Sequence, residues 1–146
     1  MVKFDKFMLK NGLTVITHHD RNTPMVAVNI IYKVGSRDED PEKTGFAHLF
    51  EHLMFGGSVN IPRYDEPLQK AGGENNAFTN NDMTTYFISV PANKLELWFW
   101  MESERLLNPV FREFYSERDV VREERRMRVE SNPTAKFEEQ FDSMFW

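Results

Sequence analysis

One stretch decides the fold: Gly45-Phe46-Ala47-His48-Leu49-Phe50-Glu51-His52-Leu53-Met54-Phe55. It is a run of apolar side chains that three polar residues interrupt, namely His48, Glu51 and His52. At helical spacing the two histidines lie one turn apart, and Glu51 shares their face. Because apolar residues occupy nearly all other positions, the sequence predicts a helix buried on nearly all sides. Thr44 or the acidic residues before it would cap the start of this helix.

This helix has the chemistry of a metal site. Two imidazoles on one face can bind a divalent ion, and a carboxylate beside them can take a proton from water that the metal activates. The spacing HxxEH is the inverse of the HExxH pattern of zinc peptidases. A match of this length also arises by accident in helices without special function. Here the apolar flanks favour the metal, because burying two histidines and a carboxylate without partners costs several kcal/mol.

The composition of the chain excludes several classes of function. The 146 residues are 40% hydrophobic and 28% charged, which is enough for the core of one domain. A formal net charge of −5 gives no basic surface, so we expect no nucleic-acid partner. The absence of cysteine leaves only nitrogen and oxygen as metal ligands. No apolar segment approaches about 18 residues, so we expect a soluble cytoplasmic or periplasmic protein without a membrane span.

The N-terminal part has the pattern of β-strands. Residues 7–10 and 13–17 flank Asn11-Gly12, the preferred two-residue turn of a tight hairpin. His18-His19 follows at the strand end, and adjacent strand residues point to opposite faces, so we expect exposed side chains rather than a metal site. Residues 25–34 are rich in β-branched side chains, which predicts a central strand covered on both faces.

The middle of the chain alternates between helix and strand signals. Residues 64–71 have helical spacing, which Gly72-Gly73 ends. Two strands are expected over 75–79 and 83–90, with turn residues between them. Residues 92–107 again show helical spacing, and we interpret their aromatic stripe as a packing face rather than a cofactor site.

The C-terminal part is first charged and then aromatic. A charged helix is expected within 113–131, and Pro133 separates it from a last helix over 134–146. The apolar side chains of that last helix would be exposed if the protein ended there. We therefore expect the chain to be a portion of a longer domain.

Together these elements predict the fold class α+β. The hairpin, the strand over 25–34 and the two strands after Gly73 would form one mixed, mostly antiparallel sheet. The helices would pack against one face of that sheet.

A zinc site with two histidines needs a third protein ligand, and a catalytic site leaves the fourth position to water. Glu117 and Glu124 lie seven residues apart in the charged segment and so share one helix face. One of them could bind the metal while the other orients a histidine. Glu123 and Glu130 are alternative ligands, and a solvated charged helix without a metal explains the same spacing.

Three segments resemble, in the same order, the pitrilysin or insulinase family of zinc metallopeptidases, which are relatives of the mitochondrial processing peptidases. They are the inverted motif at 48–52, the segment 72–79 (Gly-Gly-Glu-Asn-Asn-Ala-Phe-Thr) and the acidic segment 117–124. The resemblance covers nearly the whole chain. It implies the α+β metallopeptidase fold of that family, with residues 1–146 as the N-terminal portion of a single peptidase catalytic domain, truncated at its C-terminus.

The resemblance also implies a role for each motif position. His48, His52 and Glu124 would bind one zinc ion. Glu51 would be the catalytic general base, and Glu117 would be the supporting catalytic carboxylate. The implied activity is that of a zinc-dependent endopeptidase acting on small or unfolded peptides.

The substrate and partners are implied by the same resemblance. Asn76, Ala77 and Phe78 would lie in the edge strand on which family members bind a peptide. A second homologous peptidase half or another subunit would complete the site. The alternative is a non-catalytic substrate-binding or structural subunit of a processing-peptidase-like complex, but such subunits usually lack part of the motif, which is intact here.

Overall fold

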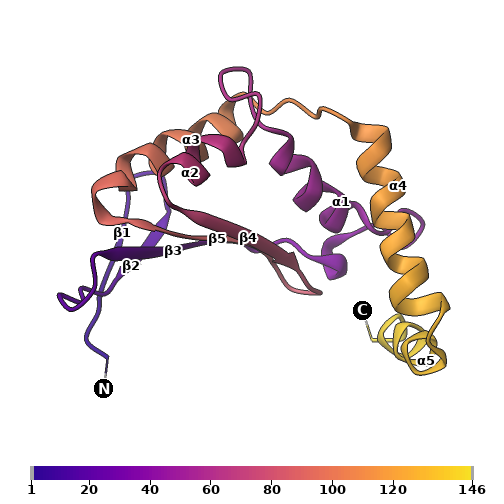
Figure 1. Ribbon diagram of the computed structural model, residues 1–146. Coiled ribbons are helices and arrows are strands. Elements are labelled where there is room, and N and C mark those ends of the chain that lie inside the picture. Colours follow the sequence, from indigo (N-terminus) through magenta and orange to yellow (C-terminus); the bar gives the residue numbers. More distant parts are fainter. Residues whose placement is uncertain (1, 146) are drawn as a thin grey trace.

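The chain folds into helices and antiparallel strands, which confirms the α+β class (Figure 1). This computed structural model describes residues 2–145. The strands are β1 (Asp5–Met8), β2 (Thr14–Thr17), β3 (Met25–Tyr32), β4 (Glu74–Thr79) and β5 (Thr84–Pro91). The helices are α1 (Phe46–Leu53), α2 (Asp65–Lys70), α3 (Leu95–Leu107), α4 (Phe114–Arg125) and α5 (Pro133–Asp142).

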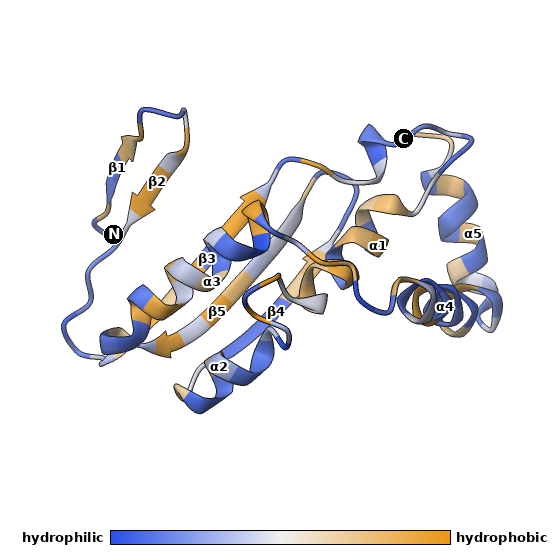
Figure 2. Cartoon of the chain, turned by 90° about the horizontal axis from the view of Figure 1, so that it is seen from above, coloured by the Kyte–Doolittle hydropathy of each residue, from blue (hydrophilic) through white to orange (hydrophobic). Residues whose placement is uncertain are grey.

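Within residues 2–145 the strands form two sheets, although the sequence predicted one. One sheet has the order β3-β5-β4, and the other is the β1-β2 hairpin, which stands apart from it in Figure 2. The prediction of a central strand over 25–34 is wrong, because β3 is an edge strand whose alternate residues are exposed. The helices cover one face of the sheet only, so the β-branched run of β3 packs on one side. The central strand is β5, and most of its residues are buried.

The hairpin turn is longer than predicted. The Leu9 N–H donates to the Leu13 carbonyl over 2.8 Å, so the loop contains three residues, 10–12. Gly12 adopts φ +89°. Three-residue hairpin loops place their last residue in this left-handed region, which glycine enters without a steric penalty. The two-residue turn is therefore wrong, although the paired strands and the exposed His18-His19 are as expected.

The core lies between the three-stranded sheet and helices α2 and α3. Leu68 of α2 and Trp98 and Met101 of α3 pack with Ile88 and Val90 of β5, and all five are buried. Figure 1 shows these helices on one face of the sheet, as predicted. Full burial of one such side chain contributes roughly 1.5–3 kcal/mol. This layer therefore fixes the sheet that carries the edge strand β4.

Helix α3 also buries an ion pair. Arg105 donates to Glu102 Oε2 over 2.5 Å, and the Tyr64 hydroxyl donates to the same oxygen over 3.0 Å. The Arg105 guanidinium lies 4.2 Å from the ring centroid of Tyr86. Burial raises the pKa of Tyr64, so its hydroxyl keeps the proton that it donates. Of the stripe predicted as a packing face, Trp98 and Met101 are buried in the core, whereas Trp100 and Leu106 are 45% and 50% exposed.

Helix α1 is less buried than predicted. Its cap is an acidic side chain, because the Glu39 carboxylate accepts from the N–H groups of Gly45 and Ala47, each over 2.6 Å. Phe46 and Phe50, four residues apart on one face, are 48% and 44% exposed. The expectation of burial on nearly all sides is therefore wrong: α1 packs against the sheet and α4 and leaves this face open.

The C-terminal helices turn away from the sheet (Figure 1). Helix α4 continues into a π-helical turn over Arg126–Glu130, and Arg125 links it to Glu139 of α5 over 2.8 Å. Helix α5 ends at Asp142, before the predicted end at Trp146, which lies outside the described residues. Its apolar side chains Phe137 and Phe141 are exposed, as expected. None of the helices within residues 2–145 is long and apolar enough to cross a membrane.

Candidate active site

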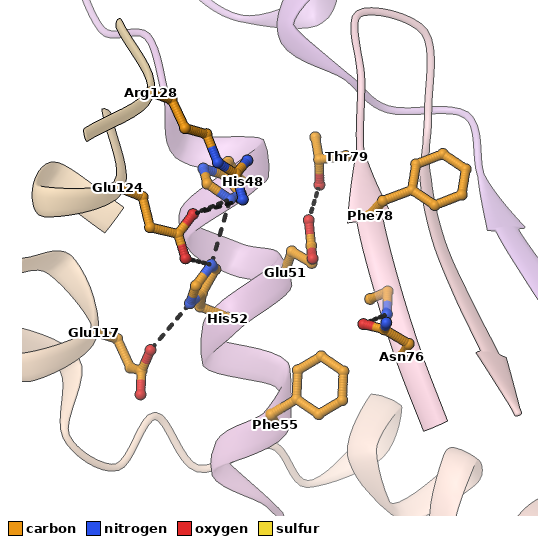
Figure 3. A pocket seen from close by; sticks show the side chains of 11 residues that line it. His48, Glu51, His52, Phe55, Asn76, Phe78, Thr79, Glu117, Glu124 and Arg128 are labelled. Carbon is orange, nitrogen blue, oxygen red and sulfur yellow. Dashed lines mark hydrogen bonds and ion pairs between the residues drawn. The ribbon is translucent and has the colours of Figure 1, made fainter. Parts of the chain in front are cut away.

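The metal-ligand candidates converge from α1 and α4 (Figure 3). The Nε2 atoms of His48 and His52 lie 3.3 Å apart. Two ligands at 2.0–2.1 Å from one tetrahedral zinc ion would be separated by about 3.4 Å. The carboxylate oxygens of Glu124 lie 3.7 Å from His48 Nε2 and 3.8 Å from His52 Nε2. One ligand atom from each residue lies within 4.8 Å of the others, so this donor set fits a single metal ion.

The neighbours of the two imidazoles suit metal binding. The Glu117 carboxylate lies 3.1 Å from Nδ1 of His52. An imidazole that donates from Nδ1 to a carboxylate presents the lone pair of Nε2 on its other side. Burial, and next the neighbouring His52, lowers the pKa of His48, which favours the neutral ring. Neutral imidazole is the form that binds metal ions.

Glu51 lines the same cavity as the two histidines, but its side chain points toward β4, whereas theirs point toward α4 (Figure 3), so the three do not share one direction as the spacing predicted. Its side chain is buried, and Thr79 Oγ1 at the end of β4 donates to Oε2 over 2.6 Å. In Figure 3, α1 lies between the acidic side chains of α4 and the strand β4. The carboxylate of Glu51 is therefore placed between the two histidines and the edge strand.

A cavity of about 440 Å³ joins these groups. It is lined by His48, Glu51, His52, Phe55, Asn76, Ala77, Phe78, Thr79, Glu117, Glu124 and Arg128. All the site residues expected from the sequence thus lie on one cavity. Since β4 pairs with β5 on one side only, its free edge borders this space.

The family model Insulinase (Peptidase family M16) matches residues 14–146. The chain belongs to the insulinase family. The resemblance seen in three segments of the sequence is thereby confirmed.

Several insulinase-family relatives are similar to this chain. The zinc protease PqqE of Helicobacter pylori is 40% identical over 136 residues, which are 90% of this chain and 31% of that protein. The human insulin-degrading enzyme is 30% identical, over 77% of this chain and 11% of its own length. A solved protease structure from Helicobacter pylori has a TM-score of 0.84 at 36% identity, and covers 93% of this chain and 34% of that one. The chain spans about a third or less of the length of these relatives.

Three side chains of the cavity were not predicted as site residues, namely Phe55, Thr79 and Arg128. Arg128 is 74% exposed and reaches to 3.6 Å from Glu124 Oε2. Its spacing of four residues from Glu124 is the signal that could have found it. Thr79 belongs to the segment 72–79 that resembles the family, but no contact with Glu51 was predicted for it, because a contact between residues 28 positions apart leaves no pattern in the sequence.

The alternative ligands Glu123 and Glu130 point elsewhere. They pair with Arg126 and Arg125, each over 3.1 Å, on the exposed side of the C-terminal helices. Of the four candidate glutamates of this segment, only Glu117 and Glu124 contact the histidines.

Proposed function

We propose that this chain is the metal-binding part of a zinc endopeptidase that hydrolyses small or unfolded peptides. The observation that carries the proposal is the convergence of His48, His52 and Glu124 on one point, with Glu51 lining the same cavity. Residues 1–146 would be the N-terminal portion of its catalytic domain. Nitrogen and oxygen ligands suit several divalent ions. Zinc is supported by the name of the Helicobacter pylori relative, a zinc protease.

Each polar residue of the cavity would have its own role in the reaction. A zinc ion held by the three ligands would supply Lewis-acid chemistry, polarising a water molecule and the scissile carbonyl. Glu51 would take the proton from that water as general base and return it to the leaving amine. Glu117 would hold the His52 ring so that Nε2 stays available to the metal.

The peptide would lie along β4. An extended peptide adds to a sheet edge through main-chain hydrogen bonds, with little demand on its sequence. Asn76, Ala77 and Phe78 line the cavity on the free edge of β4. In this structure Asn76 Oδ1 accepts from the Ala77 N–H over 2.8 Å. A docked peptide would take over this N–H and free the Asn76 amide to contact the substrate.

A second homologous half or subunit would complete the enzyme. An Arabidopsis thaliana relative, 32% identical over 77% of this chain, is named as a probable beta subunit of the mitochondrial-processing peptidase, which supports this partner. A non-catalytic role is not favoured, because Glu51 and the three ligands are all present.

The test measures metal and hydrolysis on the same sample. We expect about one zinc per chain by mass spectrometry after purification without chelator. A quenched fluorogenic peptide should be cleaved, cleavage should stop after a chelator removes the metal, and zinc should restore it. A chain that binds no zinc even after addition would contradict the site. Bound zinc without cleavage would contradict an activity of this chain alone, and addition of the second half would then have to produce it.

Replacing Glu117 with alanine should weaken zinc binding about 10–100-fold without abolishing it, the usual cost of losing a carboxylate that orients a histidine ligand. The substitution removes the acceptor 3.1 Å from Nδ1 of His52. Competition with a chromophoric chelator measures the affinity. The matched control is Glu123→Ala on the same helix, whose 58% exposed side chain pairs with Arg126. An equal loss of zinc affinity in both variants would show that the negative charge of α4, and not the contact of Glu117 with His52, determines the affinity.

A further inference from the structure

The buried carboxylate of Glu51 is held by a hydroxyl from the opposite element. Thr79 Oγ1, the last residue of β4, donates to Glu51 Oε2 over 2.6 Å, and Glu51 is only 9% exposed. Figure 3 shows the two side chains pointing toward each other between α1 and β4. Among residues 2–145, Thr79 provides the one hydrogen bond to this carboxylate, so Oε1 stays free for the cavity.

The hydroxyl of Thr79 is itself in contact with the hydroxyl of Thr84. Thr84 begins β5 directly opposite Thr79 in the antiparallel register, and their Oγ1 atoms lie 3.2 Å apart. Thr84 is buried, and its one hydroxyl proton is donated either to Thr79 Oγ1 or to the Val34 carbonyl, 3.0 Å away. When Thr84 donates to Thr79, the Thr79 hydroxyl lies in a chain that ends at the Glu51 carboxylate, and hydrogen bonds in such a chain strengthen one another. The proton of Thr79 is directed to Glu51, because an ionised carboxylate can only accept.

A buried carboxylate needs a hydrogen-bond donor, and this need alone would explain a threonine at position 79. Two features indicate that Thr79 also orients Glu51. The hydroxyl binds one carboxylate oxygen and leaves the other toward the cavity, which is the arrangement that orients a base. Thr79 also follows Phe78 on the edge strand, so one strand would set both the position of the peptide and the orientation of Glu51.

We propose that Thr79 is a positioning residue for the general base, coupling the orientation of Glu51 to the strand β4. This inference rests on the proposed function. It predicts that loss of the hydroxyl slows the chemical step and leaves peptide binding and zinc content unchanged.

The kinetic test uses Thr79→Val, which keeps the shape of the side chain and removes the hydroxyl. In the zinc-loaded chain, together with its second half if hydrolysis requires it, we expect kcat to fall about 10–100-fold, as for other hydrogen-bonded supports of site residues. KM should stay within about twofold, and Thr79→Ser, which restores the donor, should recover most of kcat. The control Thr17→Val makes the same substitution on β2, outside the cavity, and should change neither parameter.

A second readout needs no activity. In the chain labelled with ¹³C at the glutamate carboxylates, the resonance of Glu51 is assigned by its loss in Glu51→Gln. We expect it to move in Thr79→Val and to return close to the wild-type position in Thr79→Ser.

The two readouts separate the inference from the proposed function. An unmoved Glu51 resonance, an unchanged kcat, a loss confined to KM or a failure of Thr79→Ser to recover kcat would each overturn the inference. If the wild-type protein cleaves no peptide even together with its second half, the proposed function fails, and the resonance alone still decides whether Thr79 holds Glu51.

Discussion

Replacing Glu51 with glutamine should nearly abolish peptide hydrolysis and leave zinc bound. Glutamine has the same size, and its amide oxygen can still accept the hydrogen bond from Thr79. It cannot take a proton from water, and a general base contributes about 10²–10⁴-fold to the rate. We therefore expect kcat to fall by that factor. None of the three ligands changes, so the zinc content should equal that of the wild type.

Metal content and hydrolysis of the fluorogenic peptide are measured on the same preparations. The control is Glu66→Gln, an exposed glutamate of α2 that pairs with Lys70 and should keep full activity. A Glu51→Gln variant that still cleaves would contradict the assignment of the base. A variant that loses its zinc would instead assign the carboxylate to the metal site.

Residue spacing alone predicts only the part of the site that lies on one helix. His48, Glu51 and His52 share a helix, so the helical period alone places them together. The third ligand depends on how α4 approaches α1, 65 or more positions further along the chain. Helical spacing left four glutamates of the charged segment as candidates for the third ligand. The family resemblance was needed to choose Glu124 among them. The contact of Thr79 with Glu51 is equally long-range, which is why spacing did not reveal it.

The fold predictions failed where the burial of a helix or strand depends on which other elements pack against it. A β-branched run such as β3 has the same composition whether one or both faces are covered, and in this chain the helices cover one. The hydrophobic pattern of the hairpin specifies its own pairing but not the sheet that it joins. Phe46 and Phe50 likewise show that an apolar helix face is not always covered. Glycine was a more reliable local signal, because a positive φ favours it: Gly72 follows the end of α2 as predicted, and Gly12 lies in the hairpin turn, although that turn is one residue longer than predicted.

Replacing His48 with alanine should release the metal. In the wild type, His48 Nε2 lies 3.3 Å from His52 Nε2 and 3.7 Å from Glu124 Oε2, so the three donors surround one point. The variant retains one imidazole and one carboxylate, fewer than the three protein ligands of catalytic zinc sites. We expect the zinc content to fall from about one per chain to near zero after dialysis. Hydrolysis should disappear with it.

The matched control is His19→Ala, which removes an exposed histidine beyond β2 and should keep the full zinc content. Because a metal that binds only the folded chain stabilises it, zinc should raise the Tm of the wild type and of His19→Ala. The Tm of His48→Ala should not respond, and this distinguishes a lost site from a misfolded variant, which would show no cooperative transition at all. Stoichiometric zinc in folded His48→Ala would mean that other residues hold the metal. The roles proposed for His48 and His52 as ligands, and for Glu51 as the base beside them, would then be wrong.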